Sequence, residues 1–119
     1  MREIKFRGKR LDNDEWVYGD LMHSFAHDSL QRDERVYVNV RGVAPKSVGQ
    51  YTGLKDKNGR EVYEGDVVAL TPHELPFEVR FIDAAFRLVE PLTNRHEPLS
   101  NNQILKVIGN TYENPDLLS

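Results

Sequence analysis

The chain has 119 residues, no cysteine and a formal net charge of −3, from 16 lysines and arginines against 19 aspartates and glutamates. This length fits one compact domain with its own core, and the lack of cysteine excludes disulfides, cysteine-ligated zinc and thiol chemistry. A protein with a negative net charge does not attract polyanions, so nucleic acid binding would need a local basic patch.

The first segment predicts a β-hairpin over residues 3–22. Apolar Ile4 and Phe6 alternate with charged residues, and a polar turn then leads into a second strand over residues 16–22. The first ten residues are basic and the next ten are acidic. Because paired strands would set these charges opposite one another, a self-neutralised face is favoured over a nucleic acid site.

The alternating pattern stops over residues 23–34, where only three apolar residues occur among polar ones. This composition predicts a long irregular connection with at most one helical turn, and the most mobile part of the chain. Strand character resumes over residues 35–40, and Pro45 ends it because proline has no amide hydrogen to donate.

Two turn signals lie in the central block, residues 48–68. Asn58-Gly59 predicts a two-residue type I′ hairpin turn, which needs positive φ at both positions. Gly65 predicts a second corner, after which Asp66 begins an apolar strand. A corner of this kind is common in small SH3-like barrels, where a strand bends sharply to close the sheet.

The C-terminal part predicts a further hairpin, with strands over residues 77–81 and 86–89 and a turn over residues 83–85. Residues 93–103 are polar and predict a loop. A last strand is predicted over residues 104–112, followed by a short tail. Because period-two alternation recurs and helical periodicity is scarce, the fold class predicted is mainly β.

Metal and catalytic motifs give little support for an enzyme. His23 and His27 stand four apart near Asp20 and Asp28, a spacing that would suit a metal if the segment were helical. It offers no clear third ligand, so solvated histidines are the favoured interpretation. No phosphate-binding loop, dinucleotide fingerprint or nucleophile elbow occurs. We therefore predict a non-enzyme with no catalytic, cofactor-binding or metal-binding residue.

Four carboxylates gather around the two central turns, and they allow two interpretations. They could form an acid–base pair, or they could accept hydrogen bonds from nearby backbone amides. The second is favoured because carboxylates at tight turns ordinarily do this. The residues are Asp56, Glu61, Glu64 and Asp66.

Aromatic and basic side chains provide the candidate interaction residues. Each aromatic is either an exposed contact for a partner or a half-buried part of the core, and both interpretations stay open. The candidates are Trp16, Tyr18, Tyr51, Tyr63, Arg7 and Lys9. In the tail, Leu117 and Leu118 are expected to fold back, with docking into a second copy as the alternative.

Four segments carry a resemblance to a known family: residues 1–7, 17–20, 49–68 and 107–118. Together they resemble the YopX family of small phage and prophage proteins, whose molecular role is not established. The resemblance implies an SH3-like barrel as the main body, to which the residue pattern adds an N-terminal hairpin extension and a long irregular connection. The single domain, 1–119, would comprise a hairpin and connection (1–46), the barrel (47–112) and a tail (113–119). It implies no catalytic residues.

The expected function follows from these observations. No apolar stretch is long enough for a signal peptide or a bilayer span, so we expect a soluble protein in the cytoplasm of a bacterial host, with no membrane partner. The favoured function is a non-enzymatic module that binds a phage or host protein. The alternative is a nucleic-acid-binding accessory factor that uses the basic N-terminal strand.

Overall fold

The computed structural model describes residues 3–27, 32–100 and 105–118. The chain forms two compact units, Met1–Gln50 and Tyr51–Ser119. All the strand pairings of the described residues are antiparallel, and the described chain contains 3₁₀ turns but no α-helix. The predicted mainly β class is therefore confirmed, whereas the division at residues 46 and 112 stays a prediction.

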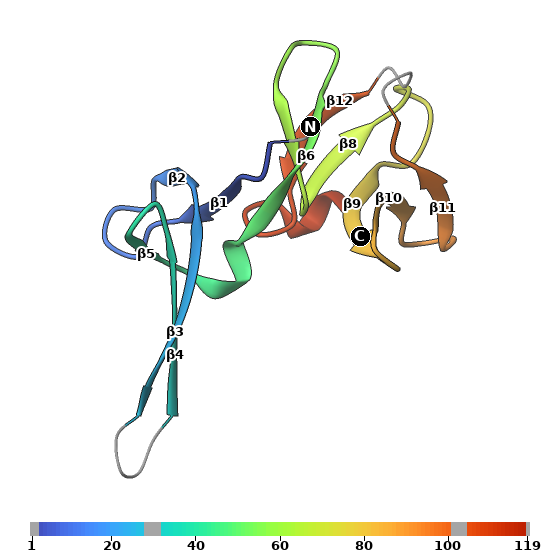
Figure 1. Ribbon diagram of the computed structural model, residues 1–119. Coiled ribbons are helices and arrows are strands. Elements are labelled where there is room, and N and C mark those ends of the chain that lie inside the picture. The colour runs from blue at the N-terminus through green and yellow to red at the C-terminus, as the bar shows by residue number, and fades with distance from the viewer. Residues whose placement is uncertain (1–2, 28–31, 101–104, 119) are drawn as a thin grey trace. The chain divides into compact units, whose positions relative to one another are not determined.

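The N-terminal unit begins with the predicted hairpin. Strand β1 (Phe6–Lys9) pairs with β2 (Trp16–Gly19), and its other edge pairs with the first two residues of β6 (Gly49–Lys55) (Figure 1). The predicted second strand is interrupted, because Gly19 has φ of +147° and the chain enters a different sheet at Leu21.

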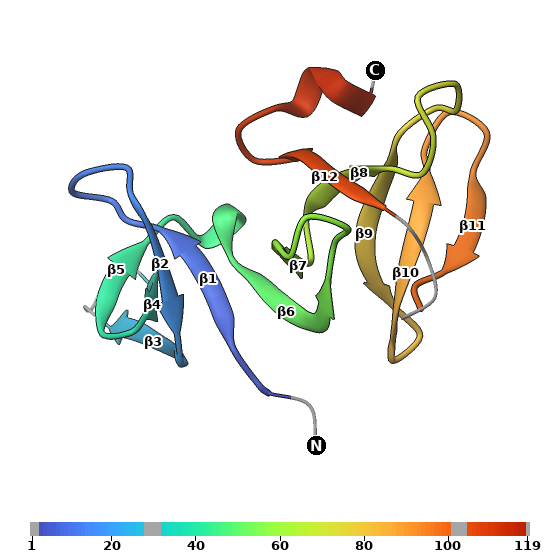
Figure 2. The ribbon, with the colours of Figure 1, turned by 90° about the horizontal axis from the view of Figure 1, so that it is seen from above.

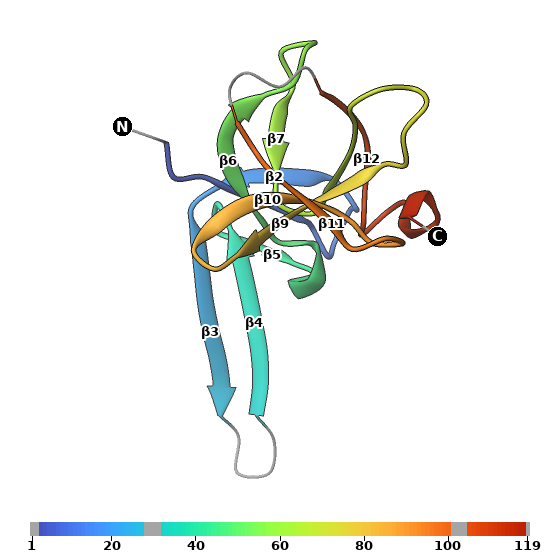
Figure 3. The same cartoon turned by 90° about the vertical axis from the view of Figure 1, so that its right-hand side faces the viewer.

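A three-stranded sheet follows, and it corrects the prediction for residues 23–34. Strands β3 (Leu21–His27) and β4 (Arg32–Val38) pair as a long ribbon (Figure 3), and β5 (Arg41–Val43) continues the sheet. The predicted irregular connection is therefore wrong for the described part of this segment; residues 28–31 lie outside it. Backbone hydrogen bonds in register build these strands, and polar composition hid them because such bonds do not depend on apolar alternation.

The turn between β4 and β5 has two residues, Asn39 and Val40, with φ of 50° and 64°. The turn between β9 and β10 is built the same way, from Asp83 and Ala84 with φ of 52° and 64°. Positive φ at both central positions is the type I′ geometry that fits the twist of a hairpin.

The predicted type I′ turn at Asn58-Gly59 is wrong in its type. The amide of Asp56 donates to the carbonyl of Arg60, and the amide of Gly59 donates to the carbonyl of Asp56, so the loop encloses three residues. Gly59 has φ of 82°. This is the three-residue hairpin loop that ends in a left-handed residue.

The C-terminal unit contains the rest of β6, which pairs with β7 (Glu61–Tyr63), and a five-stranded sheet in the order β11-β10-β9-β8-β12. Strands β9, β10 and β11 lie side by side (Figure 2). The strands of this sheet are β8 (Asp66–Ala69), β9 (Phe77–Ile82), β10 (Ala85–Glu90), β11 (Arg95–Pro98) and β12 (Lys106–Asn110). Residues 101–104 of the predicted loop and final strand lie outside the described part.

Two expectations for this unit need revision. The predicted loop over residues 93–103 contains β11, whose four residues pair with β10 despite their polar sequence. The strand orders of the described residues give open sheets and not one closed barrel. The confirmed statement is therefore a mainly β protein of several antiparallel sheets.

Each unit has its own apolar core. In the N-terminal unit, Val36, Val38 and Val43 are buried, with Phe6, Val17 and Val48 packed against them. In the C-terminal unit the buried cluster consists of Val62, Val68, Phe77, Val79, Leu88, Leu105 and Val107. These residues are mostly the alternate, inward-facing positions of their strands, as the sequence pattern indicates.

The tail folds back onto β12, as expected. Its 3₁₀ turn (Pro115–Leu118) follows Asn114, whose amide donates to the carbonyl of Asn110. A Cβ added at Gly109 would lie 2.6 Å from Cδ1 of Leu117, so the glycine leaves the space that the leucine occupies. In the described ranges there is no helix long and apolar enough to cross a membrane.

Candidate functional site

A row of three residues crosses the outer face of the β3–β4–β5 sheet. Met22 lies opposite Tyr37, and Tyr37 lies opposite Gly42. Met22 is 51% exposed. Because side chains alternate along a strand, this face is opposite the buried valines Val36 and Val38. The row therefore presents apolar and aromatic surface to solvent.

Leu11 stands next to the glycine of this row and is 70% exposed. Its amide donates to the carbonyl of Gly42 at 3.1 Å, and its neighbour Arg10 donates an amide hydrogen bond to the carbonyl of Glu15 at 2.9 Å. The Arg10 guanidinium also binds Asp12 through Nε–Oδ1 and Nη2–Oδ2 contacts of 2.8 and 2.5 Å. The backbone of Leu11 is therefore held in place, while its side chain is exposed.

The side chains of Leu11 and Tyr37 border a groove of about 260 Å³, because Gly42 contributes no side chain between them. Arg35 and Pro45 also line it, and the buried Val36 and Val43 complete its wall. This volume is below that of sites for drug-sized ligands. It suits a single apolar side chain of a partner.

Among the described residues that line the groove, one is charged. It is Arg35. Arg41 pairs with Val38 and therefore lies on the other face of the sheet from Gly42. The nearby carboxylate of Asp12 is neutralised by Arg10: their hydrogen bond is the main cause that lowers the pKa of Asp12 and raises that of Arg10. Both groups therefore stay charged and paired.

Four of the predicted interaction residues come together on one face of the β1–β2 hairpin. The register sets Arg7 opposite Tyr18 and Lys9 opposite Trp16. The guanidinium carbon of Arg7 lies 4.8 Å from the centre of the Trp16 ring, and Nζ of Lys9 lies 5.7 Å from it. These are cation–π distances. Arg7 is buried and Tyr18 is 47% exposed, so only part of this face meets solvent.

The other two candidates, Tyr51 and Tyr63, are core residues. They are 6% and 2% exposed, and their ring centres lie 5.4 Å apart across the β6–β7 pair. The Tyr63 hydroxyl donates to Oε1 of Glu61 at 2.8 Å. Of the two interpretations left open for these tyrosines, the structure supports the core one, with both side chains fully buried and not half-buried.

The carboxylate of Asp56 organises the first central turn. Its Oδ1 accepts hydrogen bonds of 2.9 Å from the amides of Asn58 and Arg60, and its Oδ2 accepts one of 3.0 Å from Val107. Burial by itself raises the pKa of Asp56, but the hydrogen bonds from Val107, Arg60 and Asn58 outweigh burial and hold that pKa below its ordinary value. Asp56 therefore acts as a structural anion.

Asp66 has the same role at the second corner, where its Oδ2 accepts a 2.8 Å hydrogen bond from the amide of Tyr63. Gly65 supplies the predicted positive φ, at 92°, and its amide donates to the carbonyl of Val79 at 2.9 Å. Glu64 lies in the turn beside it. The amide-capping interpretation of the carboxylates thus accounts for Asp56 and Asp66.

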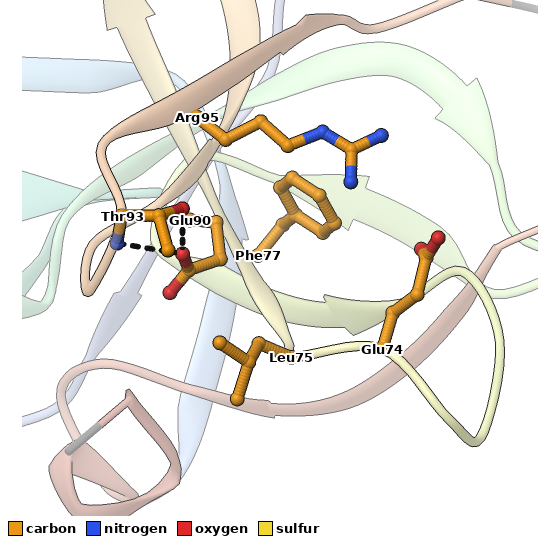
Figure 4. A pocket seen from close by; sticks show the side chains of 6 residues that line it. All are labelled: Glu74, Leu75, Phe77, Glu90, Thr93 and Arg95. Carbon is orange, nitrogen blue, oxygen red and sulfur yellow. Dashed lines mark hydrogen bonds between the residues drawn. The ribbon is translucent and has the colours of Figure 1, made fainter.

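A second hollow, of about 440 Å³, lies in the C-terminal unit between the segment before β9 and the β10–β11 turn (Figure 4). Its buried Glu90 accepts hydrogen bonds from the amides of Leu92 and Thr93 and from the Thr93 hydroxyl. The hydrogen bond from Thr93 is the main cause that lowers the pKa of Glu90. The carboxylate therefore stays ionised and fixes the turn.

Arg95, which also lines this hollow, is already engaged. Its Nε and Nη2 each lie 2.8 Å from Oε1 of Glu97, and its guanidinium carbon is 5.7 Å from the centre of the Phe77 ring. Its guanidinium lies over that ring (Figure 4). The charges of Glu90 and Arg95 thus serve the local fold, which makes this hollow a weaker candidate than the groove beside Leu11.

The proposed histidine pair does not have the geometry that motivated it. His23 and His27 lie on strand β3, where four residues span roughly 13 Å instead of one helical turn. No group of three metal-ligating residues occurs among residues 3–27, 32–100 and 105–118.

The groove residues were not among the sequence-based candidates. Leu11 belongs to a predicted turn, and Gly42 and Tyr37 lie in different strands whose pairing is not visible in the sequence. An apolar residue inside a polar turn, Leu11 before Asp12-Asn13-Asp14, was the available signal.

Strand order and site together define a small, mainly β protein with an apolar groove on one of its sheets. The model of the family described as YopX protein matches residues 5–119. The chain belongs to the YopX family.

Two solved structures are similar in fold. Protein EF1440 from Enterococcus faecalis is 21% identical, with a TM-score of 0.61 and 100% of both chains covered. Protein yopX from Bacillus subtilis is also 21% identical, with a TM-score of 0.52 and coverage of 97% of this chain and 95% of that one. A comparison with curated proteins gave no match.

Proposed function

We propose that this chain is a non-enzymatic protein-interaction module of phage or prophage origin, acting in the cytoplasm of its bacterial host. The observation that carries the proposal is the groove beside Leu11, where the exposed side chain of Leu11 faces Tyr37 across the gap at Gly42. Apolar side chains displayed around a hollow are typical of surfaces that bind proteins.

The carboxylates support a non-enzymatic role. Asp56, Asp66 and Glu90 all accept hydrogen bonds from backbone amides close to them. General acids and bases need a pKa near the working pH, whereas the pKa values of Asp56 and Glu90 are lowered further. We also retain the SH3-like character of residues 47–112 as part of the proposal, supported by the Gly65 corner that leads into β8.

Nucleic acid binding is the second candidate, because the hairpin register gathers Arg7, Lys9, Trp16 and Tyr18 on one face. It ranks lower for two reasons. Arg7 is only 6% exposed, so its charge is poorly placed for phosphate, and two cations already lie over the Trp16 ring that a base would stack on. Binding of single-stranded DNA that weakens steeply with salt and is lost in Lys9→Ala would favour this candidate instead.

The proposal is tested by affinity capture from phage-induced host cells with a groove-filled variant. At Gly42 an added Cβ would meet Cδ1 of Leu11 at 3.8 Å and Cε1 of Tyr37 at 4.0 Å, so a larger side chain starts from ordinary contact distances and extends into the groove. We compare the wild type with Gly42→Leu, and with Ala85→Leu as a control on the exposed first residue of β10.

The proposal predicts that the wild type captures a partner protein whose recovery is unchanged by nuclease treatment. The Ala85→Leu variant should recover the same amount, and Gly42→Leu about tenfold less. Equal recovery with both variants would contradict the groove as the binding surface. Loss of all partners on nuclease treatment would contradict a protein-interaction module and favour nucleic acid.

A homo-oligomer is a further expectation from the apolar tail, in which Leu117 is 37% exposed even though it contacts β12. Light scattering tests it directly. A monomer at high protein concentration would remove this expectation without affecting the groove.

A further inference from the structure

We infer that the chain forms a symmetric dimer, in which the edge of strand β3 that faces away from β4 pairs antiparallel with β3 of a second copy. The strand order of the three-stranded sheet is β3-β4-β5, so β3 pairs with one strand of the described chain and lies at the border of its sheet. None of the described residues that line the groove beside Leu11 belongs to β3. The inference therefore concerns a different surface and does not rest on the proposed function.

The outer part of the β3–β4 ribbon has no third strand among the strands that the structure describes. Strand β5 pairs only with residues 36–38, at one end of β4, whereas β3 and β4 stay paired as far as His27 and Arg32. The ribbon accordingly runs beyond β5 (Figure 1). Two strands alone are only marginally stable in water, and a third is usually needed. A strand added at the β3 edge supplies it along the whole ribbon.

The hydrogen-bonding pattern shows which backbone groups this edge presents. The amide of Asn39 donates to the carbonyl of Asp20 at 2.9 Å, and the next pair in the register is Leu21 opposite Val38. Hydrogen-bonded and non-hydrogen-bonded pairs alternate in an antiparallel ladder. Leu21 and every second residue after it therefore direct their N–H and C=O groups away from β4. The edge is a regular row of backbone donors and acceptors on a strand of seven residues.

The other sheet edges of the described chain are protected in ways that β3 is not. Edge strands are ordinarily guarded by charge, by proline, by shortness or by cover. Strand β11 contains charged residues and Pro98, and β2 and β7 have only four and three residues. Strand β12 donates the amide of Val107 to Asp56, and β5 accepts the amide of Leu11 at Gly42. Strand β3 is long and contains no aspartate, glutamate, lysine, arginine or proline.

A second copy is the partner that this edge fits. Because β3 contains none of the four charged residue types just named, two β3 strands bring no such charges face to face. A twofold axis at Ser24 sets Leu21 opposite His27 and His23 opposite Phe25, so the outward-directed backbone positions of both copies meet one another. This pairing covers both edges at once and closes the assembly at two copies. It joins two three-stranded sheets into one of six strands.

Sedimentation equilibrium of the full chain and two variants at position 25 tests the pairing. Phe25→Pro removes one outward-directed amide from each copy and leaves the amides that face β4, a position at which an edge strand tolerates proline. Phe25→Ala changes the side chain but keeps the amide. We expect the wild type and Phe25→Ala to dimerise, and Phe25→Pro to raise the dissociation constant at least about tenfold. A wild type that stays monomeric, or equal weakening by both variants, would overturn the inference.

Disulfide trapping covers the case in which Phe25→Pro does not fold. The chain has no cysteine, so Ser24→Cys places its only thiol at the proposed axis. Two residues that face each other there form a non-hydrogen-bonded pair with Cα atoms about 4.5 Å apart, which a disulfide can span. With oxidised glutathione as oxidant, Ser24→Cys should form covalent dimers at least about tenfold faster than Ala85→Cys, on the exposed first residue of β10. Equal rates would overturn the inference.

These outcomes are distinguishable from those that bear on the tail and on the groove. A dimer that persists in Phe25→Pro and is lost in Leu117→Ala would assign association to the tail and overturn pairing through β3. Capture of a cellular protein that depends on Gly42 is unaffected by either result. In any crosslinking experiment, a product of two joined copies is recognised by its mass and reports on this dimer, not on the groove.

Discussion

The amide of Val107 donates a 3.0 Å hydrogen bond to Oδ2 of Asp56, a residue fifty-one positions earlier in the chain. The other oxygen of this carboxylate holds the amides of Asn58 and Arg60. One side chain therefore shapes the loop after β6 and fastens it to β12.

Replacing Asp56 should destabilise the C-terminal unit. Asp56→Ala removes three hydrogen bonds to a charged acceptor, and we expect a loss of about 3 kcal/mol in the free energy of unfolding. Asp56→Asn keeps one oxygen but turns an amide donor toward Val107, so its loss should be smaller. Urea denaturation measures both. Asp83→Asn, at an exposed turn, is the control; an equal loss there would contradict the role of Asp56.

The same carboxylate makes stability depend on pH. The pKa of Asp56 in the folded chain lies below its ordinary value of 3.8, so its contribution is complete above about pH 5 and disappears as the pH falls through the folded pKa. Glu90, whose pKa is also lowered, contributes with the same sign. Melting temperatures between about pH 7 and pH 2 should therefore fall less in Asp56→Asn than in the wild type. Parallel curves would contradict this account.

Val40 is strained, because a β-branched residue is held at φ of 64° in a two-residue turn. Val40→Gly should raise the free energy of unfolding by about 1 kcal/mol, since glycine adopts positive φ without steric cost. Ala84→Gly, at φ of 64°, should also stabilise, whereas Ala85→Gly within β10 should destabilise. Chemical denaturation of the three variants checks this ordering, and destabilisation by Val40→Gly would refute it.

Gly109 leaves the space that the tail occupies. A Cβ there would lie 2.6 Å from Leu117 Cδ1 and 2.7 Å from Asn114 Oδ1, so Gly109→Ala should destabilise by about 2 kcal/mol. Leu117→Ala removes one of the two obstacles and should rescue part of this loss in the double variant. Thermal unfolding of the two single variants and the double variant measures the coupling. Simple additivity would show that the tail does not pack as described.

The turns show what can be inferred from the sequence and what cannot. Gly65 was predictable because a corner with positive φ favours glycine, and it has φ of 92°. The Asn58-Gly59 signal located a turn but not its type, because the Asp56 carboxylate holds Arg60 and so favours a three-residue loop. The type I′ turn at Asn39 and Val40 contains no glycine, so the sequence did not predict it.

The strands show the same division. The pairing of β1 with β2 followed from alternation around Phe6, whereas β3, β4 and β11 include polar stretches that resemble loops. The groove could not be predicted from the sequence for a related reason. It depends on Tyr37 lying opposite Gly42 across a hairpin whose turn has no glycine, and on Leu11 lying beside Gly42, from which it is distant in the sequence.

The most direct test of the central claim is site-specific photo-crosslinking in phage-induced host cells. A photoreactive phenylalanine replaces Met22, which is 51% exposed on the row beside Tyr37, or Phe81, which is 48% exposed on β9. The account predicts a discrete crosslinked protein from position 22 that disappears when Gly42→Leu is added, and none from position 81. A crosslink from position 81 alone, or one from position 22 that persists with Gly42→Leu, would contradict the assignment of the groove as the partner-binding surface.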